Sequence, residues 1–221
     1  MRKSILRTGL ASVLFLASAA SADQIVNLNT EFSGGTAPSG PAPWASVTFH
    51  TVSTGTVDVT FSAFGLTGGA TGEFITEWDI NFDPTKNPAS LLIAAQSGDT
   101  AAVGSISQAA DSFKADGDGF FDIEFLFNTS GDRLTSGESA TFRITGTGIN
   151  ESSFIFPSVN GGGVGTFTSA AHVQGTGLNG GFSGWIGNGG TAVPLPASLW
   201  GGMALLGALG FAKARARRLS A

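Results

Sequence analysis

The 221-residue sequence contains neither cysteine nor tyrosine, and only 12% of its residues are charged. The lack of cysteine excludes a disulfide scaffold, a thiolate metal site and a thiol nucleophile. The shortage of basic residues argues against a nucleic-acid binder, and the low total charge argues against a coiled coil. Glycine (33 residues) and phenylalanine (18 residues) are abundant instead. Because the phenylalanines are spread along the chain, the composition indicates a folded domain rather than simple disorder.

The first 22 residues are typical of a secretory signal peptide. Basic residues precede a short apolar run over residues 10–17, and the small residues Ala20 and Ala22 stand three and one positions before Asp23. This run is well short of the roughly 20 apolar residues that a membrane-spanning helix needs. We therefore expect export, with cleavage after Ala22.

The last thirty residues contain three features in succession. The apolar segment 198–212 is apolar on every face, so it is no amphipathic surface helix and we expect it to lie in lipid. As a helix, residues 197–212 would span about 24 Å, which is short for a hydrocarbon core of about 30 Å. A basic tail after it should stay cytoplasmic and leave the upstream chain outside. The motif before it is Val193-Pro194-Leu195-Pro196-Ala197, and the tail residues are Lys213, Arg215, Arg217 and Arg218.

Together these features resemble the PEP-CTERM sorting signal of Gram-negative bacteria, in the variant with a V-P-L-P-A motif. The resemblance covers residues 193–218 and implies recognition by an exosortase, a membrane cysteine protease-transpeptidase that cuts near the motif. It further implies transient anchoring in the inner membrane, followed by release or transfer to the cell surface or the extracellular matrix. Leu195 stands where the commoner motif has glutamate, which leaves the exosortase subtype open. A plain C-terminal membrane anchor is the alternative.

The segment between the two ends is strongly acidic. Residues 23–192 carry all sixteen acidic residues and four basic ones, a net charge of −12. Such a domain repels phosphate backbones and anionic lipid, so we expect no nucleic-acid partner. The expected partners are the secretion machinery, the exosortase and, as a further candidate, extracellular polysaccharide.

Residues 23–186 show the alternation of β-strands. In the segment 74–82, Trp78 and Ile80 fall on the inward face, whereas Glu77 and Asp79 fall on the other. The same period recurs in several segments, and glycine-rich turns separate eight to ten predicted short strands. With no convincing helical period, this pattern predicts a single all-β domain, an antiparallel β-sandwich or jelly roll. A flexible linker is expected over residues 187–192. The other alternating segments are 47–52, 57–63, 121–127, 140–145 and, more weakly, 164–173.

Two sets of residues are candidates for ligand binding. Asp116, Asp118 and Asp122 are closely spaced and separated by glycine, so they could wrap carboxylates around a calcium ion; no other cofactor is expected. The alternative for this segment is a hairpin turn that leads into a strand. Trp44 and Trp185 lie among Pro, Gly and Ser and could form a flat platform for sugar rings.

Catalytic motifs are scarce. The chain has no G-x-S-x-G or H-E-x-x-H motif, and the glycine pattern at 175–180 lacks the helix that a dinucleotide site requires. Glu77 and Asp79 lie about 7 Å apart on one strand face, a spacing that a glycosidase could use. His172 could pair with a carboxylate or bind a metal. We expect a non-enzymatic exported protein, with a polysaccharide-binding module or a carboxylate-dependent polysaccharide hydrolase as alternatives.

Overall fold

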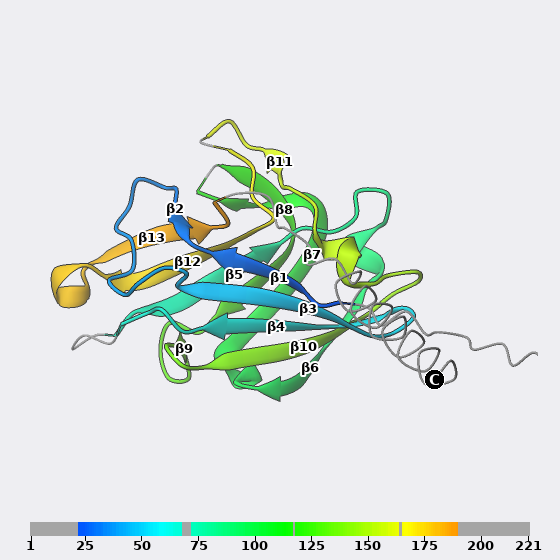
Figure 1. Ribbon diagram of the computed structural model, residues 1–221, viewed down its shortest axis with the longest axis horizontal. Coiled ribbons are helices and arrows are strands. Elements are labelled where there is room, and N and C mark those ends of the chain that lie inside the picture. The colour runs from blue at the N-terminus through cyan, green and yellow to red at the C-terminus, as the bar shows by residue number, and fades with distance from the viewer. Residues whose placement is uncertain (1–21, 68–71, 117, 164, 190–221) are drawn as a thin grey trace, which may run out of the picture.

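The computed structural model describes residues 22–67, 72–116, 118–163 and 165–189. These residues form two antiparallel sheets, which Figure 1 shows one behind the other. The helical elements among them are short 3-10 turns, so the predicted all-β class is confirmed. The turns are η1 (Pro88–Ser90), η2 (Thr100–Ala102), η3 (Glu151–Phe154) and η4 (Leu178–Gly180).

The first sheet has five strands and every neighbouring pair in it is antiparallel. In spatial order its strands are β1 (Gln24–Leu28), β3 (Ala45–Ser53), β4 (Thr56–Ala63), β10 (Ser139–Thr145) and β6 (Leu92–Gly98).

The second sheet has eight strands and contains the candidate site. Its main path is β11 (Val159–Asn160), β8 (Gly119–Phe127), β5 (Phe74–Ile80), β12 (Ser169–Thr176), β13 (Phe182–Gly187) and β2 (Thr30–Glu31). In addition, β7 (Val103–Ala115) pairs with β8, and β9 (Leu134–Thr135) pairs with β5.

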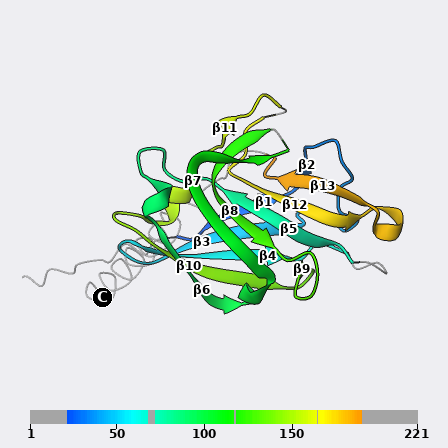
Figure 2. The ribbon, with the colours of Figure 1, turned by 180° about the vertical axis from the view of Figure 1, so that it is seen from behind.

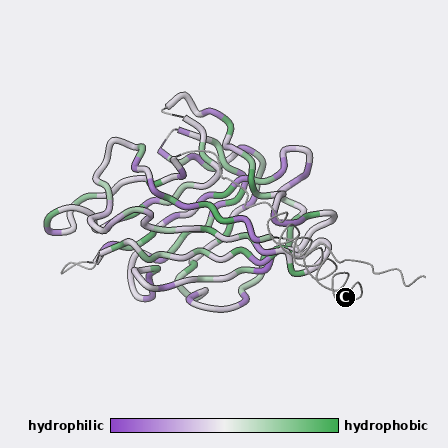
Figure 3. The backbone as a smooth tube through the Cα atoms, viewed as in Figure 1, coloured by the Kyte–Doolittle hydropathy of each residue, from purple (hydrophilic) through white to green (hydrophobic). Residues whose placement is uncertain are grey.

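The main core lies between the two sheets. Its centre is Phe61 of β4, whose ring centroid is 4.8 Å from that of Trp78 and 4.6 Å from that of Phe125. In the alternating segment 57–63 the apolar residues are predicted to point inward, and all four are buried: Val57, Val59, Phe61 and Ala63. Burial of each phenylalanine contributes about 2 to 3 kcal/mol, which stabilises a domain that has no disulfide. Figure 3 shows hydrophobic stretches along the central strands and hydrophilic ones toward many of the loops.

A β-bulge interrupts the predicted alternation in β5. His172 of β12 pairs with Glu77 and the next residue, Val173, pairs with Ile75, so Thr76 is the extra residue. The side chains before the bulge therefore change faces. Ile75 and Trp78 both belong to the main core. They are three positions apart, so a strict period of two would place them on opposite faces of the sheet.

The outer face of the eight-stranded sheet, seen in Figure 2, is partly covered by a second cluster of apolar residues. In it the rings of Phe32 and Phe167 stack with their centroids 4.1 Å apart. The sequence places Asp79 and Asn81 on an outward face, yet they are 0% and 2% exposed. We call the second apolar cluster the outer cluster; it comprises Phe32, Ala115, Phe121, Phe167 and Ala170, with Phe113 and Trp185 packed against it.

The last described residues are bonded into the fold. Gly187 ends β13, and the Oδ1 atom of Asn188 accepts a hydrogen bond from the backbone N–H of Thr168 at 2.8 Å. The N–H of Gly189 donates to Oδ1 of Asn29 at 2.9 Å. The first three residues of the predicted linker thus belong to the folded domain, and its other residues lie outside the described part.

Candidate functional site

Three acidic side chains converge on the outer face of the eight-stranded sheet. Asp79 of β5 lies directly opposite Glu124 of β8, and Glu77 stands two residues before Asp79 on the same strand. One carboxylate oxygen from each residue lies within 4.8 Å of the others. We call these residues the acidic trio. Within the described ranges they form the only group of three or more acidic, histidine or cysteine side chains gathered this closely.

The strand register explains how these residues meet. Residues i and i+2 of a strand point to one face, and directly opposed residues of antiparallel strands lie about 5 Å apart at Cβ. Two cross-strand rows therefore run side by side over this face. One row is Gly187, Ala170, Asp79 and Glu124, and the other is Trp185, His172, Glu77 and Leu126.

Exposure differs sharply within the acidic trio. Glu77 and Glu124 are half-buried, whereas Asp79 is fully buried. Neither carboxylate oxygen of Asp79 has a hydrogen-bond partner. A buried carboxylate without a partner is strongly unfavourable in its charged form, so Asp79 requires either a proton or a nearby cation.

Burial and mutual repulsion raise the pKa values of two of these acids. Burial is the main cause of the raised pKa of Asp79, and the charges of Glu77 and Glu124 raise it further. The pKa of Glu77 rises to about 7, mainly through burial and then through the charge of Glu124 and a hydrogen bond with it. Without a cation, Asp79 and Glu77 therefore retain protons at a higher pH than ordinary carboxyl groups do.

His172 and Trp185 flank the acidic trio in the second row. The ring centroids of these two residues are 5.1 Å apart, and Nδ1 of His172 lies 2.8 Å from Oγ1 of Thr76. Burial lowers the pKa of His172, while the charge of Asp116 partly opposes this. His172 is therefore a neutral neighbour near pH 7 and supplies no positive charge to the trio.

The arrangement is suited to two kinds of chemistry. A carboxyl group that keeps its proton near pH 7 can act as a general acid. Three carboxylates within reach of one point can also coordinate a hard cation, since such ions prefer oxygen ligands. The sequence indicated Glu77 and Asp79 as a pair, but Glu124 lies 45 positions further along the chain and only the strand register brings it close.

The aspartates predicted to bind calcium do not form such a group. Asp122 accepts hydrogen bonds from the backbone N–H groups of Phe82 and Asp111, each at 2.8 Å. Asp116 has a φ of 45°, and the N–H of Asp118 donates to the Ala115 carbonyl at 2.8 Å. The alternative interpretation, a hairpin turn, is confirmed, because the segment connects β7 to β8.

The two tryptophans predicted as a sugar platform are in different environments. Trp44 is 8% exposed and belongs to the main core, where its Nε1–H donates to the Gly40 carbonyl at 2.7 Å. Its ring is therefore inaccessible to a sugar. Trp185 is half-buried beside His172 and packs against the outer cluster. The structure therefore does not support a platform made of both rings.

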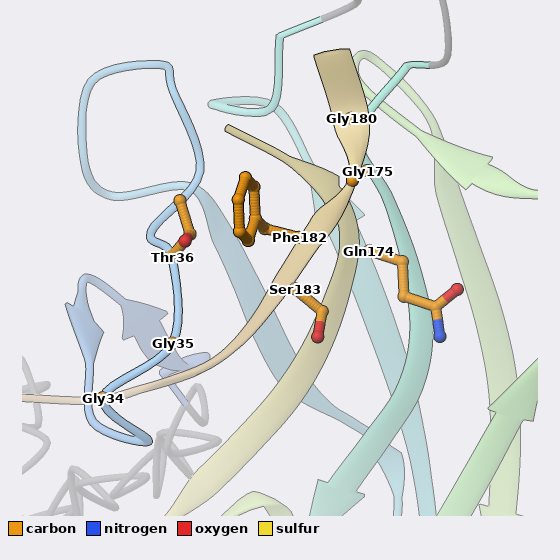
Figure 4. Close-up of a pocket in the computed structure, with 9 residues that line it drawn as sticks. Gly34, Gly35, Thr36, Gln174, Gly175, Gly180, Phe182 and Ser183 are labelled. Carbon is orange, nitrogen blue, oxygen red and sulfur yellow. The ribbon is translucent and has the colours of Figure 1, made fainter. Parts of the chain in front are cut away.

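The glycine pattern at 175–180 forms the end of the hairpin between β12 and β13. Gly175 and Gly177 have φ angles of 78° and 71°, which favour glycine and explain this part of the pattern. The hairpin borders a pocket of about 650 Å³ opposite the loop around Gly35 (Figure 4). Phe182 is 59% exposed there, and no charged side chain lines the pocket. The pocket is thus separate from the acidic trio.

The residues of the predicted export and sorting signals lie largely outside the described part of the chain. This applies to Ala20, to the motif Val193–Ala197 and to the basic tail. Within the described residues, no helix has the length and apolar character needed to cross a membrane. Asp23, the first residue of the predicted mature chain, is already part of the fold, since its Oδ1 lies 2.6 Å from Nδ1 of His50.

Scans of the chain against protein-family models, curated protein sequences and solved structures found no match.

Proposed function

We propose that this chain is an exported, non-enzymatic protein, delivered to the cell surface or the extracellular matrix and processed at its V-P-L-P-A signal by an exosortase. The observation that carries the proposal is the order of motif, apolar segment and basic tail over residues 193–218, behind an N-terminal signal peptide. The β-sandwich between them is the delivered part. Its strands run from Gln24 to Gly187, so they use no residue of the predicted sorting signal.

The physical properties of the body support this route. Its sixteen acidic and four basic residues keep it soluble and repel anionic membrane surfaces after release. Its stability comes from an aromatic core rather than from disulfides, so folding outside the cytoplasm needs no oxidation step.

The proposal is tested by the intact mass of the protein recovered from its native host. We expect a chain that begins at Asp23 and lacks the tail residues Arg217 and Arg218, found in the medium or the outer envelope. A host without its exosortase should keep the tail on the chain. Recovery of the mature protein with both arginines still attached would instead indicate an ordinary membrane anchor.

Motif variants separate recognition by the exosortase from general damage to the chain. Pro194→Ala combined with Pro196→Ala should leave the uncut precursor in the inner membrane. The matched control is Pro84→Ala, an exposed position far from the motif in the sequence, which should be processed like the natural chain. Equal processing of all these proteins would show that the motif is not the recognition element.

A polysaccharide-binding role would rest on Trp185 together with His172, because Trp44 is buried. The Trp185→Ala variant distinguishes this function from simple delivery. Loss of matrix retention in this variant, with normal processing at the sorting signal, would favour glycan binding. Unchanged retention in the matrix would show that Trp185 does not bind glycan there.

A further inference from the structure

Asp79 stands out among the buried polar side chains of the described residues. Three buried side-chain atoms lack a hydrogen-bond partner there, and two of them are the carboxylate oxygens of Asp79; the third is Oγ1 of Thr176. Buried polar groups in folded proteins are satisfied in the large majority of cases, so each exception requires an explanation. For a carboxylate, the partner that is not part of the chain is a proton or a cation.

No basic side chain of the described residues is placed to neutralise the acidic trio. Lys86 forms an ion pair with Asp83, and Arg143 forms one with Asp58. The other two basic residues lie over aromatic rings. Nζ of Lys114 is 5.2 Å from the ring centroid of Phe120, and Cζ of Arg133 is 4.2 Å from that of Phe74.

The geometry of the acidic trio fits a single oxygen-coordinated cation. Calcium binds oxygen ligands at about 2.3 to 2.6 Å, so two ligands of one ion lie at most about 5 Å apart. The oxygens of the trio lie within 4.8 Å of one another, which meets this limit. Three carboxylates supply three to six oxygens, and water can complete the six to eight that calcium takes.

The depth of the three side chains also fits an ion that enters from solvent. Asp79 is fully buried, whereas Glu77 and Glu124 are half-buried, so part of the acidic trio is in contact with solvent. Asp79 and Glu124 are directly opposed on hydrogen-bonded strands, so their spacing is fixed by the sheet rather than by a loop. A rigid pair of ligands reduces the conformational entropy lost on binding.

We propose that Glu77, Asp79 and Glu124 form a binding site for a divalent cation of the calcium type on the outer face of the eight-stranded sheet. The ion neutralises the buried carboxylate of Asp79 and joins β5 to β8. This site differs from the one predicted over Asp116–Asp122. It is also independent of how the C-terminal signal is processed.

The test measures calcium binding and thermal unfolding of the full-length chain at pH 8, with EDTA, CaCl2 or MgCl2. Calcium at about a hundred times its Kd should raise the Tm by roughly 5 to 10 °C, because the ion binds only the folded state. Calorimetry should give one ion per chain. The Asp79→Asn and Glu124→Gln variants should lose the calcium-dependent shift while remaining folded in EDTA.

The matched control is Asp116→Asn, which removes one carboxylate from the hairpin turn and should keep the full calcium effect. If this control loses the effect and Asp79→Asn keeps it, the ion binds at the hairpin and the proposal is wrong. An unchanged Tm with both calcium and magnesium, together with no binding heat, would show that Asp79 holds only a proton and would also overturn it.

Discussion

Two acidic regions of the same sheet differ in what their carboxylates contact. In the segment 116–122, Asp122 is 8% exposed and accepts hydrogen bonds from two backbone N–H groups. In the acidic trio, Asp79 is 0% exposed and accepts none. The aspartates of the segment 116–122 lie closer together in the sequence than the acids of the trio do. Of the two regions, however, only the acidic trio brings its carboxylates around one point.

This difference shows how a structural acid is distinguished from a candidate ligand. The side chain of Asp122 links the end of β5 to the irregular part of β7, and its oxygens are used in doing so. Asp79 contributes no such link, and burial makes its charged form unfavourable. Substitution of the two residues should therefore change stability in opposite directions.

The largest effect is expected for Asp122→Ala. The substitution leaves the N–H groups of Phe82 and Asp111 without their acceptor in a buried or half-buried setting. Each hydrogen bond to a charged group contributes about 1.5 to 3 kcal/mol, so we expect a loss of about 3 kcal/mol in the free energy of unfolding. Urea unfolding followed by tryptophan fluorescence measures it. A loss below about 1 kcal/mol would mean that these bonds are not structural.

Much of the fold could be predicted from alternation alone. The inward residues of 57–63 are buried as predicted, and most of those of 121–127 join them in the main core. Period two works there because each strand has one face against the opposite sheet. It fails at Thr76, where one extra residue shifts the faces and no residue type in the local sequence indicates a bulge.

The burial of Asp79 could not be predicted because its neighbours are distant in the sequence. The outer cluster brings Phe32 and Phe167 together over the sheet, although 135 positions separate them. Likewise Glu124 joins Asp79 only through the pairing of β5 with β8. A local pattern assigns such acids to a solvated face, since it contains no information about which segments cover that face.

A smaller effect of opposite sign is expected for Asp79→Asn in EDTA at pH 8. Without a cation, folding at pH 8 requires Asp79 either to bury its charge or to take up a proton, and the amide removes this cost. The NH2 group of the amide can also donate to Glu77 or Glu124. We expect a gain of about 1 to 2 kcal/mol in the free energy of unfolding. Asp122→Asn is the matched control, because the same change there weakens existing hydrogen bonds and should reduce stability. If both variants lose stability equally, the two aspartates have the same role.

The smallest effect concerns Asp83, a third acid that extends the comparison to the surface. A hydrogen bond from Lys86, followed by those from Thr85, lowers the pKa of Asp83 to about 2. Because its pKa is lower in the folded state, this group stabilises the protein above about pH 4, and the contribution disappears as the pH falls toward 2. In a partly solvated turn we expect less than about 1 kcal/mol.

The Lys86→Met variant tests this assignment. Carboxyl chemical shifts measured by NMR between pH 1.5 and 6 should show the pKa of Asp83 rising toward its ordinary value of 3.8. The rise should be incomplete, because Thr85 still donates from its backbone N–H at 2.9 Å and its hydroxyl at 2.6 Å. An unchanged pKa would assign the whole shift to the turn. Asp83 would then resemble Asp122, because neutral hydrogen-bond donors rather than a cation would hold its carboxylate.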